Sequence, residues 1–242
     1  MAHVYNTRHL RSLTAPNTWP IERKKFYWIK KPSPSTYPIH LGMPILIWLR
    51  DYLKIAKNKR EVKYLLNNKK VLINWRVRRD LGFQVGLFDV ISIPEIGKHY
   101  RVIIDERGKL GLREISEEES KIKIVRIIRK TMINNGKIQV TGFDGSNYIV
   151  DNSIKTGDSL VVSLPDLEIR DILKMEEGNQ IFIFYGSKVG KIGILKEVRI
   201  LRKPFGHTRF VKYINIDSKE EEETVWDYTV VIGKDKPIIT IR

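Results

Sequence analysis

The sequence predicts an α+β protein that is mainly β and is divided into several small domains. Only two stretches, residues 45–55 and 58–68, repeat apolar residues at helical spacing. From residue 100 onward, short runs of β-branched residues alternate with turn signals such as Asn-Gly and Asp-Gly. Hydrophobic residues make up 42% of the 242 residues, which is enough to form a core in each of several domains.

Residues 1–40 are expected to form an extended basic arm. Five prolines between positions 16 and 38 exclude a continuous helix. The arm also contains Trp19, Phe26, Tyr27 and Trp28, and so many large rings are unusual in a solvated linker. Two interpretations stay open. The arm packs on its own protein, or it lies along RNA with its cations on phosphates and some of its rings on bases.

Residues 41–94 are predicted to form a small module of two helices and short strands. The first helix is expected at 45–55, with Pro44 at its first turn. A second helix is expected after Asn58, a good N-cap residue, with Glu61 three positions on as in a capping box. Its buried stripe is Val62, Leu65 and Leu66, and Asn67 or Asn68 is expected to end it. Strands should follow at 71–73, 77 and 90–93.

The rest of the chain is predicted to form a central β domain at 95–172 and a small β-barrel domain at 173–242. Ser116 and Glu119 indicate a second capping box for one helical turn. The acidic run at 219–224 is expected to be a solvated loop. The strands that we expect in these two domains are 101–105, 110–112, 121–129, 160–163, 180–184, 191–195, 198–200, 211–214, 224–226 and 229–232.

The positive charge is concentrated in the first third of the chain. The net charge is +16 and the pI about 9.8. Residues 1–31 carry seven basic and one acidic residue, and residues 54–80 carry ten and two, whereas residues 81–242 are nearly balanced. This distribution predicts one face that binds a polyanion. Cations at the amino end of the second helix oppose its dipole, which favours anion contact there, although a solvated basic face is the alternative.

The composition argues against several other classes of protein. There is no apolar run of membrane-spanning length and no secretory signal, so cytoplasm is the expected location. The chain has no cysteine, and its five histidines are widely spaced, so we expect no metal site. Gly186, Gly190 and Gly193 lie between two strands with no helix after them, which predicts a tight turn and not a phosphate loop. We therefore expect no cofactor, no small-molecule substrate and no enzymatic activity.

Several motifs, in order along the chain, are similar to those of one family. They are His9-Leu-Arg-Ser-Leu-Thr-Ala-Pro-Asn-Thr-Trp19, Pro38-Ile-His40, Arg76-Val-Arg-Arg-Asp80, Val85-Gly-Leu-Phe-Asp-Val-Ile-Ser-Ile93, Tyr100-Arg101, Asp105-Glu-Arg-Gly108, Gly186-Ser-Lys-Val-Gly-Lys-Ile-Gly193 and Tyr228-Thr-Val-Val-Ile-Gly233 with Lys236-Pro237. The family that the chain resembles is small-subunit ribosomal protein four of archaea and eukaryotes, the "e" type. The short carboxyl end favours the archaeal branch.

The resemblance implies a structural protein of the small ribosomal subunit that binds rRNA early in assembly. Its partners would be small-subunit rRNA and neighbouring small-subunit proteins, with no membrane. It also implies that residues 41–94 are an S-four-type RNA-binding domain and that residues 173–242 are a KOW-type, Src-homology-three-like barrel. The KOW turn would contain Gly186, Lys188, Gly190, Lys191 and Gly193.

The charge pattern and the resemblance together give a set of expected RNA-binding residues. They are Arg8, His9, Arg11, Trp19, Arg23, Lys24, Lys25, Lys30, Lys31, His40, Lys59, Arg60, Lys63, Trp75, Arg76 and Arg78. We expect the main face to comprise Arg60, Lys63, Arg76 and Arg78. Strand alternation would point Arg79 to the opposite side, so Arg79 is expected to be peripheral.

The chain departs from the family pattern at four places, two of which lie in residues 41–94. Asn74-Trp75 replaces a family Asp-Gly turn, and Lys69 stands where the family has a helix-ending glycine. Tryptophan rarely adopts positive φ, so either the turn differs or Trp75 stacks on something. Two rival functions stay open, an RNA-modifying enzyme that carries an S-four-type module and a KOW-containing transcription or translation factor.

Overall fold

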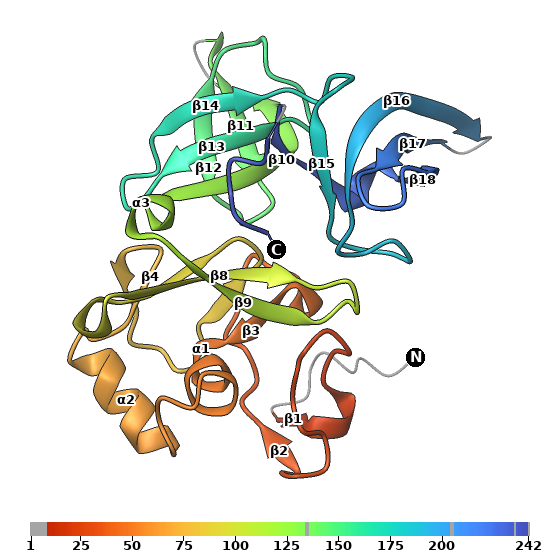
Figure 1. Cartoon of the computed structure of the whole chain (residues 1–242). Coiled ribbons are helices and arrows are strands. Elements are labelled where there is room, and N and C mark those ends of the chain that lie inside the picture. The colour runs from red at the N-terminus through yellow and green to blue at the C-terminus, as the bar shows by residue number, and fades with distance from the viewer. Residues whose placement is uncertain (1–8, 134–135, 204–205, 235, 242) are drawn as a thin grey trace. The chain divides into compact units, whose positions relative to one another are not determined.

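The computed structural model describes residues 9–133, 136–203, 206–234 and 236–241. Two compact units divide the chain (Figure 1): unit 1 comprises Met1–Ile103 and Lys109–Ser120, and unit 2 comprises Ile104–Gly108 and Lys121–Arg242. Most of the regular structure is β, which confirms the predicted class. Among the described residues, no helix is both long and apolar enough to cross a membrane.

Unit 1 is built around a five-stranded sheet. In sheet order its strands are β5 (Arg76–Val77), β4 (Leu72–Ile73), β7 (Val90–Ile93), β8 (Lys98–Ile104) and β9 (Leu110–Ile115), and a separate pair joins β3 (Gly42–Pro44) to β6 (Gln84–Gly86). The turn at Pro94–Ile96 joins β7 and β8 into an antiparallel hairpin. The boundary expected between residues 94 and 95 thus lies inside this hairpin.

The helices of unit 1 follow the sequence signals closely. Helix α1 (Ile45–Ile47) continues into a π-helical turn, η4 (Trp48–Tyr52), and the two bury five apolar side chains. Helix α2 (Lys59–Asn67) begins as predicted: the side chain of Asn58 accepts a hydrogen bond from the Glu61 backbone N–H at 3.0 Å. The Glu61 carboxylate in turn accepts from the backbone N–H of Lys57 at 2.7 Å.

The carboxyl end of α2 differs from the prediction. Neither Asn67 nor Asn68 is left-handed; instead Lys69 has φ 59°. Asparagine adopts the left-handed conformation more readily than lysine, but the asparagines do not determine where α2 ends. The chain must turn one residue later, at Lys69, for Val71 to be buried and β4 to begin. This is the position at which the family pattern has glycine.

Replacing Lys69 with glycine is expected to stabilise the protein by about 0.5–1 kcal/mol. The change removes the free-energy cost of a left-handed lysine. This gain exceeds the entropic cost of the extra backbone freedom that glycine has in the unfolded chain. Thermal melting of Lys69→Gly measures the effect. Asn68→Gly is the matched control, because Asn68 has φ −81° and gains no relief; equal melting temperatures for the two variants would contradict this account.

The described part of the basic arm, residues 9–40, packs on its own unit. Strand β1 (Leu10–Arg11) pairs with β2 (Trp28–Ile29), and the loop between them carries Trp19, which is only 1% exposed. The Trp19 indole N–H donates to the carbonyls of Ile39 (3.1 Å) and Gly42 (3.0 Å). The backbone N–H of Leu110 donates to Thr18 O at 2.7 Å. The interpretation that the arm packs on its own protein is therefore correct for the side that faces the core.

Unit 2 contains two five-stranded antiparallel sheets. The first has the order β12 (Asn147–Val150), β11 (Ile138–Gly142), β10 (Ile122–Met132), β13 (Ser159–Ser163) and β14 (Ile169–Leu173). The second has the order β18 (Glu221–Val225), β17 (Gly206–Asn215), β16 (Ile192–Lys203), β15 (Gln180–Ile183) and β19 (Thr229–Gly233). The acidic run predicted as a loop is thus mostly strand β18. It pairs with strand β17, which places Glu223 opposite Lys212 and Glu222 opposite Tyr213.

Candidate nucleic-acid interface

The exposed cations of helix α2 form the first part of the interface. Lys59, Arg60 and Lys63 are all exposed, and none has an ion-pair partner among the described residues. The neighbouring carboxylate, Glu61, is occupied by the N-terminal cap of the helix. The cap therefore leaves the positive charge at this end of α2 uncompensated, as anion binding requires.

The turn at Asn74-Trp75 positions the second part, strand β5. Both residues are left-handed, with φ 51° and 60°. Asn74 is held by Asp89, to which its side-chain amide donates at 2.8 Å, and by Val90, whose backbone N–H donates to its side-chain oxygen at 2.8 Å. These bonds compensate for the strain of a turn that contains no glycine.

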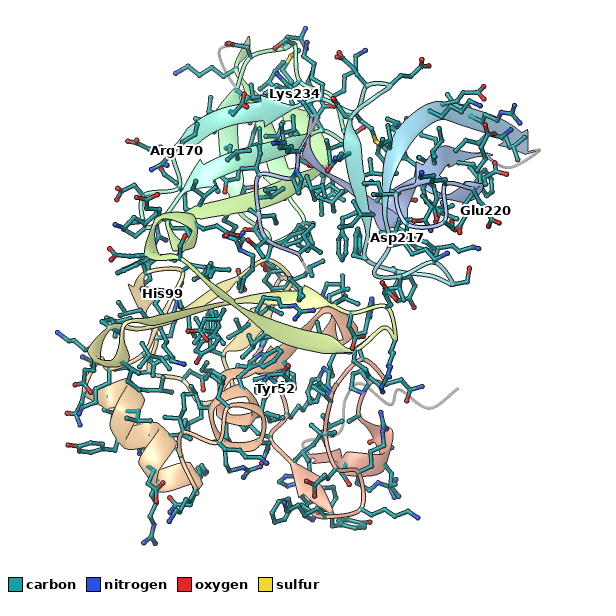
Figure 2. All side chains as sticks on the ribbon, in the orientation of Figure 1. Tyr52, His99, Arg170, Asp217, Glu220 and Lys234 are labelled. Carbon is teal, nitrogen blue, oxygen red and sulfur yellow. The ribbon has the colours of Figure 1, made fainter. Side chains whose placement is uncertain are left out.

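Trp75 stacks on its own protein. Its ring lies 5.4 Å from that of His99, labelled in Figure 2, and its indole N–H donates to Ser120 O at 3.1 Å. The turn thus has positive φ and Trp75 also stacks, which joins the two outcomes considered for this position. The ring is half-buried, and its contact with RNA stays a prediction.

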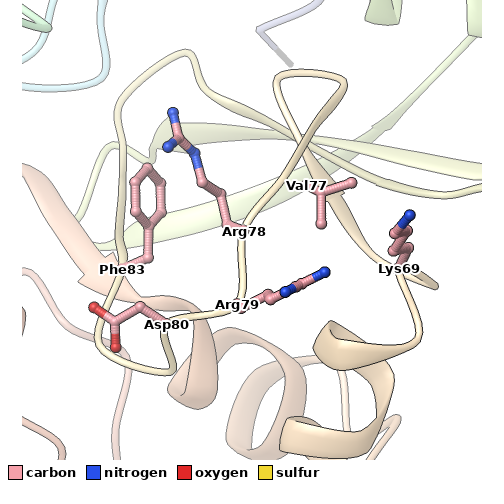
Figure 3. Close-up of a pocket in the computed structure, with 6 residues that line it drawn as sticks. All are labelled: Lys69, Val77, Arg78, Arg79, Asp80 and Phe83. Atoms are coloured by element: carbon pink, nitrogen blue, oxygen red, sulfur yellow. The ribbon is translucent and has the colours of Figure 1, made fainter.

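The segment after β5 departs from the strand alternation that we expected. Strand β5 ends at Val77, so alternation says nothing about Arg78 and Arg79. The Arg78 guanidinium lies over the Phe83 ring, 4.8 Å from its centroid. Figure 3 shows Arg79 extending toward Lys69, while Asp80 points away from both. Arg79 therefore lies beside Arg78 on the rim of one hollow rather than on a separate face. The hollow is lined by Lys69, Val77, Arg78, Arg79, Asp80 and Phe83.

Asp80 is occupied by a local turn and does not neutralise these arginines. Burial raises the pKa of Asp80, but hydrogen bonds from Ser33 and from the Gly82 backbone N–H, with the charge of Lys30, outweigh burial and lower it. The Gly82 N–H donates to the Asp80 carboxylate at 2.9 Å. The charge facing the hollow is thus positive.

Several expected RNA-binding residues of the arm have structural contacts. Trp19 is buried, so the expectation that it stacks on RNA is corrected. Arg23 donates to the carbonyls of Leu13, Ala15 and Pro16 at 2.9–3.3 Å and thereby closes the loop around Trp19. His40 is half-buried, and burial lowers its pKa, which keeps the ring neutral near pH 7.

Other expected arm residues lie at the surface. Arg11 and Lys24 are exposed. Lys25 is also exposed, and its Nζ lies 3.3 Å from the Glu22 carboxylate. His9 is exposed, with its ring 5.4 Å from Trp28. Lys30 and Lys31 are half-buried, and Arg8 lies outside the described residues.

The list of expected RNA contacts omits exposed rings and cations that the structure brings to the surface. Phe26, Tyr27 and Trp28 are 49%, 62% and 54% exposed, next to Lys24 and Lys25. The three rings are consecutive in the sequence and follow two lysines, and this pattern could have identified them as RNA-binding residues. Lys69 and Arg79 were also omitted, because their position depends on where α2 and β5 end.

The glycine turn of unit 2 has the close backbone approach that we predicted. Gly186 and Gly190 are left-handed, with φ 92° and 81°. A Cβ on Gly190 would lie 2.5 Å from the backbone nitrogen of Glu106, so no side chain fits there. The two lysines of the turn, however, are paired with one carboxylate: Lys188 and Lys191 lie 3.2 Å and 2.6 Å from Glu222.

The Glu222 carboxylate is strongly held in its ionised form. Burial raises its pKa, but hydrogen bonds from Lys191, Tyr213 and Lys188 outweigh burial and lower the pKa to about 2. The Tyr213 hydroxyl donates to it at 2.6 Å. The lysines of this turn are therefore less available to RNA than those of α2.

The stability that Glu222 contributes should depend on pH. Because its pKa is lowered on folding, the contribution is complete above the ordinary value of 4.5 and is lost as the pH falls toward 2. Glu222→Gln should melt below wild type at pH 7, and the difference should shrink between pH 5 and pH 3. Melting curves at these pH values test this; a difference that is constant with pH would contradict it.

Comparisons with known proteins identify related sequences and a related structure. The model of "Ribosomal family S4e" matches residues 96–169, and that of the "RS4NT (NUC023) domain" matches residues 5–34. "Small ribosomal subunit protein eS4" of Nanoarchaeum equitans is 51% identical over 81% of this chain and 84% of its own length. The protein of the same name from Korarchaeum cryptofilum is 38% identical over the whole of both chains. The crystal structure of the 30S ribosomal protein S4e from Thermoplasma acidophilum is 31% identical, with a TM-score of 0.69 over 82% of this chain and 99% of that one.

Proposed function

Because the chain belongs to the archaeal-type S4e family of small ribosomal subunit proteins, we propose that its unit 1 binds small-subunit rRNA. The protein is a structural constituent of the small subunit of the cytoplasmic ribosome. Nothing in the comparisons supports the rival readings, an RNA-modifying enzyme and a free transcription or translation factor. The observation that carries the proposal is the cluster of exposed, uncompensated cations on α2 and after β5.

Binding would follow from phosphate contact and from the fixed shape of unit 1. Lys59, Arg60 and Lys63 come from a capped helix, and Arg76 and Arg78 from a hairpin whose turn is held by Asn74 and Trp75. Rigid placement of cations lets them match phosphates at fixed spacing and release counterions on docking. Arg11, Lys24, Lys25 and the exposed rings of the arm would extend the same interface.

Unit 2 would have a different role. We assign β15–β19 to a KOW-type small barrel, which the five-stranded antiparallel sheet and the glycine turn support. Since Lys188 and Lys191 are paired with Glu222, this barrel would contribute less to phosphate binding than unit 1. Neighbouring small-subunit proteins are then its expected partners.

The protein is expected to sediment with small ribosomal subunits and to resist mild salt washing. A lysate of growing cells, fractionated on a sucrose gradient at moderate salt, tests this with an antibody against the chain. Recovery only in the soluble fractions would overturn the proposal. A variant with alanine at Lys59, Arg60 and Lys63 should leave the subunit at lower salt than wild type.

A further inference from the structure

We propose that the hollow beside β5 binds one nucleotide of the rRNA that is rotated out of its base stack, an inference that rests on the proposed function. The hollow has a volume of about 570 Å³, within the range of about 300–1,000 Å³ typical of small-ligand sites. Figure 3 shows the residues that line it: Lys69, Val77, Arg78, Arg79, Asp80 and Phe83.

One side of the hollow suits a base. The Arg78 guanidinium is held over the Phe83 ring, 4.8 Å from its centroid, which orients the guanidinium plane. Unstacked RNA bases stack on arginine planes and on aromatic rings. Val77, which is 41% exposed, adds an apolar wall. A phosphate alone would gain nothing from the Phe83 ring or from Val77.

The other side suits a phosphate. Lys69 and Arg79 both line the hollow, with Arg79 extending toward Lys69 (Figure 3), and neither has an ion-pair partner among the described residues. The Asp80 carboxylate is held by Gly82 and points away. A base on one side and a phosphate on the other are the two ends of a nucleotide.

The backbone at Lys69 supports the same assignment. Lys69 has φ 59°, a conformation that is unfavourable for lysine and that glycine adopts without strain. A strained conformation with a long cationic side chain that lines a hollow points to a use for that side chain. Duplex RNA offers phosphates but keeps its base faces stacked, so an unpaired nucleotide fits the whole site better.

The test uses the full-length protein and a transcript of the small-subunit rRNA. Arg78→Lys keeps the charge but loses the planar group, so the affinity should fall about tenfold with an unchanged salt slope. Lys69→Gly should lower the slope of log affinity against log salt by nearly one, although the variant melts no lower than wild type. Arg113→Lys, at an exposed arginine of β9, is the matched control and should bind like wild type.

Dimethyl sulfate probing of the complex gives a second readout. Wild type should protect an unpaired base that becomes reactive again in the Arg78→Lys complex. If Lys69→Gly lowers the slope but Arg78→Lys changes neither affinity nor reactivity, the site takes a backbone phosphate alone and the nucleotide proposal is overturned.

A pair of substitutions outside the hollow separates the two proposals. If Arg60→Ala and Lys63→Ala lower the salt slope while Lys69→Gly and Arg78→Lys bind as wild type, the nucleotide site is refuted and the rRNA-binding function stands. If none of the four affects binding to the naked transcript, the proposed function itself fails. Loss of subunit association with normal transcript binding would instead assign the hollow to a protein neighbour and refute the nucleotide.

Discussion

Trp19→Ala should destabilise unit 1 by about 3–5 kcal/mol, the range for removing a buried tryptophan. The side chain is 1% exposed, and its N–H bonds to two carbonyls would be lost with the ring. Those carbonyls, of Ile39 and Gly42, would remain without their donor. Thermal melting and limited proteolysis of the arm measure the effect.

Trp28→Ala is the matched control for this prediction. Trp28 lies in the same arm but is 54% exposed, so its loss should change the melting temperature little. If both variants melt at the same temperature, Trp19 does not hold the arm on unit 1. If Trp28→Ala weakens RNA binding without altering stability, the two faces of the arm have separate roles.

Alanine at Arg60, Lys63, Arg76 and Arg78 together should remove most of the electrostatic binding by α2 and β5. Each phosphate contact contributes nearly one unit to the slope of log affinity against log salt on duplex-like RNA, so the slope should fall by about three to four. Val62 and Leu66 remain in place, so the helix should still fold. Filter binding of the rRNA transcript from low to moderate salt measures the slope, and an unchanged slope with a native melting curve would refute this face.

A second quadruple variant controls for the change in total charge. It removes four exposed cations of unit 2 and lowers the net charge equally. The substitutions are Arg107→Ala, Arg129→Ala, Lys137→Ala and Arg170→Ala. The slope should fall much less than in the first variant. Equal losses would mean that RNA responds to net charge and not to a defined face.

Elements fixed by neighbours in the sequence could be predicted from the residues. The start of α2 depends on Asn58 and Glu61, three positions apart, and the capping box before α3 (Glu117–Ser120) depends on Ser116. The concentration of charge in the first third likewise needs no tertiary information, since it requires only counting. These local signals located most of the candidate interface.

Features that depend on distant partners could not be predicted in the same way. Trp19 looked like a ring for RNA because its acceptors lie 20 and 23 residues away. The pairing of Lys191 with Glu222 could not be predicted, because Glu222 lies 31 residues away, on a strand predicted as a loop. A pattern of residue types shows that a side chain is basic or aromatic, but only the fold shows what it contacts.

The anchoring of the arm has a consequence for how the protein would meet its RNA. Residues 10–29 are already tied into unit 1 by the β1–β2 pair, by Trp19 and by the Thr18–Leu110 bond. Their conformational entropy is therefore lost when the polypeptide folds, before any encounter with RNA. Association then joins two prepared surfaces, so that the arm would not be the slow step in building the subunit.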